Sequence, residues 1–123
     1  MNDFAKQFED LRIWQDARIQ AVSLYRDFGT GMPAERDFGY RDQIQRAGVS
    51  VMNNIAEGFE RHSAAEFAHL LNIAKGSCGE VRSMLYLAED LQYLAPEIAH
   101  SRRERARQLS KGIESLAKSL RSK

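Results

Sequence analysis

The residues best suited to chemistry in this chain stand in two Glu-x-x-His sequences, Glu66 to His69 and Glu97 to His100. Di-metal carboxylate bundles use this spacing twice, with two further Glu from other helices. Here each pair lies in the first turn of a predicted helix, and the two helices are consecutive and antiparallel. The pairs are therefore expected at opposite ends of the molecule as solvated surface residues. A metal enzyme that uses Glu66 and His69 is the weakest alternative.

A second polar set lies along residues 43–61, where the sequence has the periodicity of a helix. At about 100° per residue, one stripe of polar side chains falls within about 80°. This polar stripe consists of Gln43, Arg46, Ser50, Asn54 and Glu57. Its residue types suggest an active site, but Ser and Asn are poor helix formers, and a solvated face normally carries Lys, Glu and Arg. The stripe is therefore interpreted as an ordered polar seam against another helix.

Other signatures of enzyme active sites are absent from the sequence. It contains no phosphate-binding loop, dinucleotide fingerprint or H-E-x-x-H, and no serine in a nucleophile-elbow context. Cys78 is the single cysteine, which excludes an internal disulfide framework and any multi-cysteine metal site. Its apolar surroundings predict a small core residue rather than a reactive thiol. No catalytic residue, metal or cofactor is assigned, and the protein is predicted not to be an enzyme.

Four amphipathic segments must position these residues. Apolar side chains recur at helical spacing over residues 11–28, 40–61, 64–94 and 97–120. No segment has the alternation of a strand. The chain is therefore predicted to be all-α, with residues 1–123 forming a single domain that is an antiparallel up-down-up-down four-helix bundle.

The connections between these helices carry recognisable signals. A loop rich in glycine follows the first helix over residues 29–39. Ser63 and Glu66 form a capping box that begins the third helix only two or three residues after the second. Pro96 suits the first turn of the fourth helix.

The short connection after the second helix gives the polar stripe a partner. In an antiparallel hairpin that turns near residue 62, Arg46 lies level with Glu80 and Ser50 lies near Ser77. We therefore expect Ser77 and Glu80 to complete the polar seam. An Arg46–Glu80 ion pair would fix the register of the two helices without adding much stability, because desolvation offsets the attraction.

Two features indicate contacts beyond one four-helix core. Apolar residues of the second helix spread over about 180°, whereas one core requires little more than about 100°. The excess predicts subunit contacts through Val49, Met52, Ala56 and Phe59; the alternative is a helix that is central in its own monomer. In the third helix, Gly76 and Gly79 each cost up to about 1 kcal/mol relative to Ala, which predicts close packing of another helix there.

Composition and charge limit the kinds of partner that this protein is expected to have. The 123 residues are 43% hydrophobic and 28% charged, as in folded proteins. No apolar run reaches the ~18 residues of a membrane span, and the first residues lack a signal pattern. We therefore expect a cytoplasmic location and no membrane partner. Net charge is +1, but residues 96–123 carry +5 and the rest −4.

The last predicted helix is thus a basic segment on a mildly acidic body. Five of its cations share one stripe: Arg103, Arg107, Lys111, Lys118 and Arg121. Such a stripe can contact successive phosphates of RNA or DNA, and these are the predicted nucleic-acid-binding residues. The alternative is a solvated helix face with cations favoured near its carboxyl end.

Two long patterns carry a family resemblance. One is Gln-x-x-Arg-Ala-x-x-Ser leading to Asn-Ile-Ala-Glu-Gly over residues 43–58, and the other is Ala-x-Gly-Ser-x-x-Glu over residues 74–80. With FEDLRIWQDA at 8–17, Pro33-x-Glu35 and LAEDLQYL at 87–94, they resemble the four-helix bundle proteins named after 23S rRNA intervening sequences. Met52 stands where the family often has Pro.

The resemblance implies a homopentameric ring of four-helix bundles with no agreed catalytic activity. Related bundles are accessory proteins of diversity-generating retroelements, which implies nucleic acid and a reverse transcriptase as partners. We therefore predict a non-enzymatic, oligomeric bundle that binds RNA or DNA through basic surface. The alternative is a protein-interaction scaffold with no nucleic-acid role.

Overall fold

The computed structural model describes residues 5–122 and contains no strand within that range. Its elements are the short 3₁₀ helix η1 and four α-helices. Their bounds are Phe8–Asp10 for η1, Arg12–Asp27 for α1, Phe38–Phe59 for α2, Ala64–Asp90 for α3 and Pro96–Arg121 for α4. The predicted all-α four-helix fold is confirmed. The described residues do not include Lys123, which ends the predicted basic segment. They also do not include residues 1–4, which begin the region without a signal pattern.

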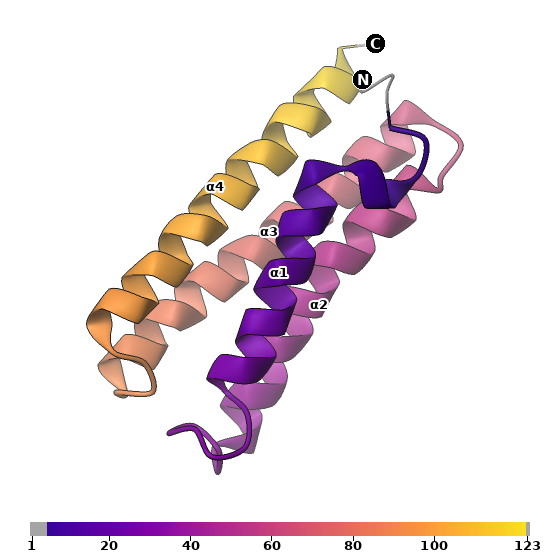
Figure 1. The fold of residues 1–123 in the computed structure, drawn as a ribbon. Helices are drawn as coiled ribbons and strands as arrows, with labels where there is room; N and C mark the ends of the chain where they lie inside the picture. The colour runs from indigo at the N-terminus through magenta and orange to yellow at the C-terminus, as the bar shows by residue number, and fades with distance from the viewer. Residues whose placement is uncertain (1–4, 123) are drawn as a thin grey trace.

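Consecutive helices run in opposite directions, and α1 begins at the end of the bundle where α4 finishes (Figure 1). Each helix packs on the next one in the chain, and α1 meets α4 less extensively. The backbones of α1 and α3 do not approach each other closely, so these helices lie on a diagonal of the bundle. Their side chains meet in the core, where the Gln20 amide donates to Cys78 Sγ at 4.0 Å. None of the described helices is long and apolar enough to cross a lipid bilayer.

The core is divided into two apolar clusters along the bundle. One, near the α2–α3 turn, is built around Ile55, Leu71 and Ile113, and the other, near the opposite end, around Phe28 and Ile44. Burial at both levels supplies the main stabilisation of the fold, because removing apolar surface from water is the dominant favourable term in folding.

Cys78 belongs to the first cluster and is 1% exposed, which confirms that it is a core residue. Its Sγ donates to the carbonyl oxygen of Ala106 at 3.2 Å. Burial raises the pKa of the Cys78 thiol, which keeps it in the unreactive protonated form.

Apart from the start of α3, the helix boundaries differ from those predicted by one to four residues. The helix α2 begins at Phe38 rather than residue 40, because the Asp37 carboxylate caps it by accepting from the Tyr40 backbone N–H at 3.2 Å. The helix α3 ends at Asp90 rather than residue 94, because Gln92 adopts a left-handed φ of 62°. The predicted start of α3 is confirmed by Ser63, whose side chain accepts from the Glu66 N–H.

The prediction of close packing at Gly76 and Gly79 is wrong within this chain. A Cβ added at either position would meet nothing within 4 Å. Helical glycines with close neighbours occur in α2 instead, where a Cβ at Gly58 would lie 2.8 Å from Phe67 Cδ1. Close helix packing within the monomer therefore does not explain the exposed glycines of α3.

Candidate nucleic-acid interface

The structure contains the predicted polar seam between α2 and α3, and the side chains at its centre are uncharged. The hydroxyls of Ser50 and Ser77 lie 2.9 Å apart, which confirms the predicted register of the hairpin. The Asn54 side-chain amide donates to the Ser50 carbonyl at 2.8 Å and to its hydroxyl at 3.0 Å. These bonds satisfy half-buried polar groups, and the seam therefore has a structural role.

The charged members of the seam do not pair as predicted. Arg46 binds Asp42, one turn earlier on α2, at 2.9 Å, and the Gln43 side-chain amide donates to Glu80 at 3.2 Å. The predicted Arg46–Glu80 ion pair is therefore wrong. An exposed arginine finds a carboxylate four residues away on its own helix without ordering a second helix. Glu57 is paired in the same way, with Arg61.

The two Glu-x-x-His pairs lie at the starts of α3 and α4, at opposite ends of the bundle (Figure 1). All four side chains are exposed. Within residues 5–122, no three His, Cys, Asp or Glu side chains gather as a metal site requires.

Cations from two helices converge on the face where α3 packs against α4. This α3/α4 basic face consists of Lys75, Arg82, Arg107, Lys111, Lys118 and Arg121. It surrounds a shallow hollow of about 430 Å³ and includes the carboxylate of Glu114. Six cations with so few carboxylates make a surface that favours a polyanion.

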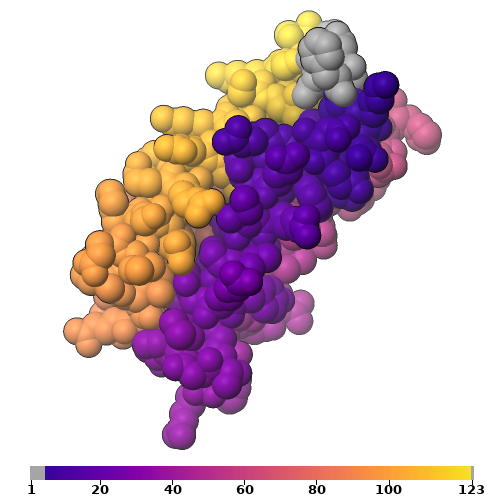
Figure 2. All heavy atoms as spheres, viewed as in Figure 1, coloured from indigo at the N-terminus to yellow at the C-terminus, as the bar shows by residue number. Residues whose placement is uncertain are grey.

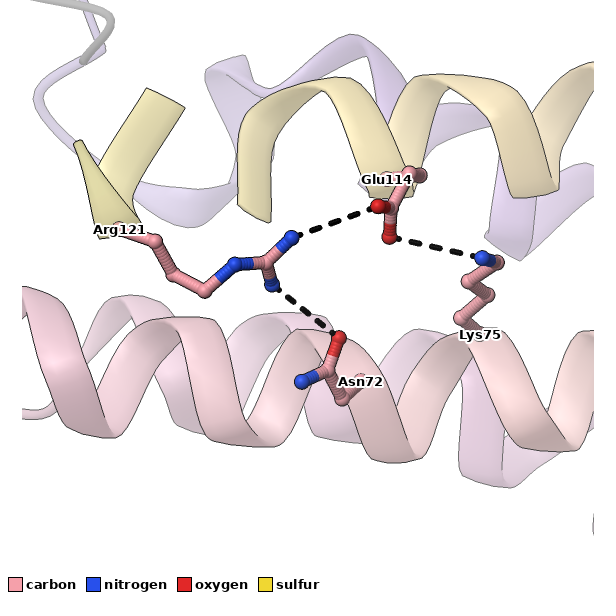
Figure 3. A network of polar contacts seen from close by, with 4 residues as sticks. All are labelled: Asn72, Lys75, Glu114 and Arg121. Carbon is pink, nitrogen blue, oxygen red and sulfur yellow. Dashed lines mark hydrogen bonds and ion pairs between the residues drawn. The ribbon is translucent and has the colours of Figure 1, made fainter. Parts of the chain in front are cut away.

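Glu114 holds two of these cations in place (Figure 3). It lies 3.5 Å from Lys75 Nζ and 3.3 Å from an Arg121 guanidinium nitrogen, and Arg121 also reaches Asn72 at 3.5 Å. Burial alone would raise the pKa of Glu114, but the attraction of Lys75, Arg121 and Lys118 outweighs it and the pKa is lowered. Glu114 therefore stays ionised and links the two helices.

The remaining lysines of the face are free to meet a ligand. Lys111 and Lys118 are exposed, and neither takes part in an ion pair in the described part of the chain. Arg107 is half-buried and lies 3.3 Å from Glu104.

Arg103 behaves differently from the other members of the predicted stripe. It is only 9% exposed, donates to Glu89 at 2.9 Å and lies 4.1 Å from the centre of the Tyr86 ring. This geometry ties α4 to α3 and leaves little of the charge for a ligand.

Sequence reasoning missed the contribution of α3 to the basic face. Lys75 and Arg82 are seven residues apart, so they share one side of their helix. That side is recognisable as basic surface only after α3 is paired with α4, because neither residue belongs to a charge run.

The four predicted subunit-contact residues, Val49, Met52, Ala56 and Phe59, are half-buried. Met52 and Phe59 pack against the first core cluster of their own chain. Because α2 contacts both α1 and α3, two neighbours account for much of its wide apolar arc. The large apolar side chains that remain exposed lie mostly on α1 and α3.

The fold and its surfaces define a class of small four-helix bundles that present charged and apolar faces to solvent. The chain belongs to the 23S rRNA-intervening sequence protein family, whose model matches residues 9–115. Among solved structures it is similar to a Bacteroides thetaiotaomicron protein of unknown function from the S23 ribosomal protein family, with 27% identity and a TM-score of 0.79. That match covers 86% of this chain and 95% of the other. No curated protein matches the chain significantly.

Proposed function

We propose that this protein is a non-enzymatic helical bundle that assembles into a homo-oligomer and binds RNA or DNA through the α3/α4 basic face. The observation that carries the proposal is the convergence of Lys75, Arg82, Lys111 and Lys118 around one shallow hollow. Cations spread along two adjacent helices can contact successive phosphates without reading bases.

The family supports this proposal in two ways. Its name ties members to insertions in 23S rRNA genes, and the resemblance to retroelement accessory proteins implies a pentamer, with a reverse transcriptase as a further partner. A pentamer would repeat the basic face five times and strengthen the field that attracts a polyanion.

Binding of labelled RNA and DNA by fluorescence anisotropy tests the nucleic-acid role. The test variant replaces Lys75, Arg82, Lys111 and Lys118 with Gln. The matched control replaces four exposed cations elsewhere, Lys6, Arg36, Arg46 and Arg61, with Gln, so that net charge changes equally. We expect the test variant to bind at least about tenfold more weakly at low salt, because removing a cation that neutralises a phosphate weakens binding to every sequence.

Equal losses of affinity in the two variants would show that only net charge matters and would reject this face as the site. A wild-type protein that binds neither RNA nor DNA at low salt would instead favour the protein-interaction scaffold. Circular dichroism of both variants checks that the helices are retained.

A further inference from the structure

The outward side of α1 is apolar and cationic and has no partner in the monomer. Ile19, Val22 and Tyr25 are 46%, 43% and 52% exposed, and Arg18 and Arg26 are exposed beside them. At about 100° per residue these five side chains fall within about 120°. Figure 2 shows α1, in purple, crossing the visible face of the molecule. We call this set the α1 outer face.

The outward side of α3 has the opposite charge. Its exposed residues at helical spacing include Ile73, Gly76, Glu80, Ser83, Leu87 and Asp90, and Leu91 follows directly as the C-cap residue. Ile73, Leu87 and Leu91 are 42%, 44% and 48% exposed, and the seven positions fall within about 100° of the helix circumference. We call this set the α3 outer face.

The two faces complement each other in charge and in shape. The α1 outer face holds arginines and no carboxylate, whereas the α3 outer face holds Glu80 and Asp90 and no lysine or arginine. Space around Gly76 is open, so the backbone of α3 can be approached closely by the large side chains of another helix. The α1 face is about 12 Å long and the α3 face about 26 Å at ~1.5 Å per residue, so the first fits within the second.

One chain cannot bring these faces together, because α1 and α3 lie on a diagonal of the bundle and both faces are exposed on its outside. We infer that the α1 outer face of one copy packs on the α3 outer face of the next. Such a contact is head-to-tail, and repeating it gives a ring when the rotation closes. This inference rests on the proposed homo-oligomer and names the surfaces that would form it.

Chemical crosslinking tests the pairing directly. In the double variant Val22→Cys/Ser83→Cys, each helix carries one exposed thiol, while Cys78 is buried. A short bifunctional maleimide should produce a ladder of covalent multimers from the double variant. Either single variant should give none, because a head-to-tail contact does not bring like positions together. A ladder from Val22→Cys alone, or no ladder from the double variant, would overturn the inference.

Charge reversal gives a second, independent readout by light scattering on a size-exclusion column. Arg18→Glu/Arg26→Glu should dissociate the oligomer, and adding Glu80→Arg/Asp90→Arg to the same chain should restore it. If the wild type is oligomeric and the Arg18→Glu/Arg26→Glu variant is also oligomeric, the result rejects only the contact between the α1 and α3 outer faces. If the wild type is a monomer at micromolar concentration, both this pairing and the proposed assembly fail. The anisotropy comparison between the α3/α4 basic face variant and its matched control tests the nucleic-acid role separately.

Discussion

At the scale of single residues, Arg103 separates structural from ligand-binding cations. The residue is 9% exposed, and its guanidinium is paired with Glu89 and lies against the Tyr86 ring. We expect Arg103→Gln to lower the free energy of unfolding by about 1–3 kcal/mol, because it removes a charged hydrogen bond in a poorly solvated place. Urea unfolding measures this.

The exposed Lys118 provides the control for Arg103. The change Lys118→Gln should alter stability by less than about 0.5 kcal/mol while weakening nucleic-acid binding. Equal effects of the two substitutions on stability would contradict the structural role of Arg103.

Asp37 makes the start of α2 sensitive to acid. The Tyr93 hydroxyl, which donates to it at 2.6 Å, and then the Tyr40 backbone N–H lower the pKa of this carboxyl below its ordinary value of 3.8. A lowered pKa in the folded state means that the stabilisation is complete above the unfolded value and is lost as pH falls through the folded one.

The stability difference between wild type and Asp37→Ala should therefore be constant near neutral pH and shrink below the ordinary aspartate pKa. Urea midpoints across a pH series measure it, and Tyr93→Phe should reproduce part of the effect. A difference that is as large in strong acid as at neutral pH would rule out the carboxylate as its source.

At the scale of helices, the glycines of α2 and α3 predict opposite responses to alanine. The change Gly76→Ala should stabilise the isolated bundle by up to about 1 kcal/mol, because alanine is the better helix former and space is open there. The change Gly58→Ala should destabilise it, since the new Cβ would lie 2.8 Å from Phe67 Cδ1 and 3.2 Å from Leu70 Cβ. Thermal unfolding of both variants gives the sign directly, and destabilisation by Gly76→Ala in a monomeric sample would contradict the open space.

The helices were predictable from the sequence because their apolar periodicity is strong, and the hairpin register that sets Ser50 against Ser77 followed from a short turn. The end of α3 was not predictable, because Gln92 takes the left-handed conformation without the glycine that usually signals it. The predicted partner of Arg46 was wrong because a long exposed side chain pairs with the nearest carboxylate. The part of the candidate site on α4 was predictable from the sequence, because the lysines of α4 form a stripe. The part on α3 was not predictable, because the cations that α3 contributes form no stripe.

At the scale of the whole molecule, the charges are sorted by face rather than by segment. Cations gather where α3 meets α4 and along the outside of α1, while the outside of α3 is acidic. The first of these surfaces suits a polyanion, and the other two suit each other. The proposed nucleic-acid contact and the proposed subunit contact therefore use separate faces of the chain.

The salt dependence of RNA binding tests the central claim most directly. Affinity is measured by anisotropy over a series of salt concentrations for the wild type, the variant lacking Lys75, Arg82, Lys111 and Lys118, and the matched control. We predict a steep fall for the wild type and the control, and a shallower slope of log affinity against log salt in the test variant. The slope should decrease by about one for each phosphate that the variant no longer neutralises. Identical slopes in all three proteins would contradict the claim that the α3/α4 basic face binds nucleic acid.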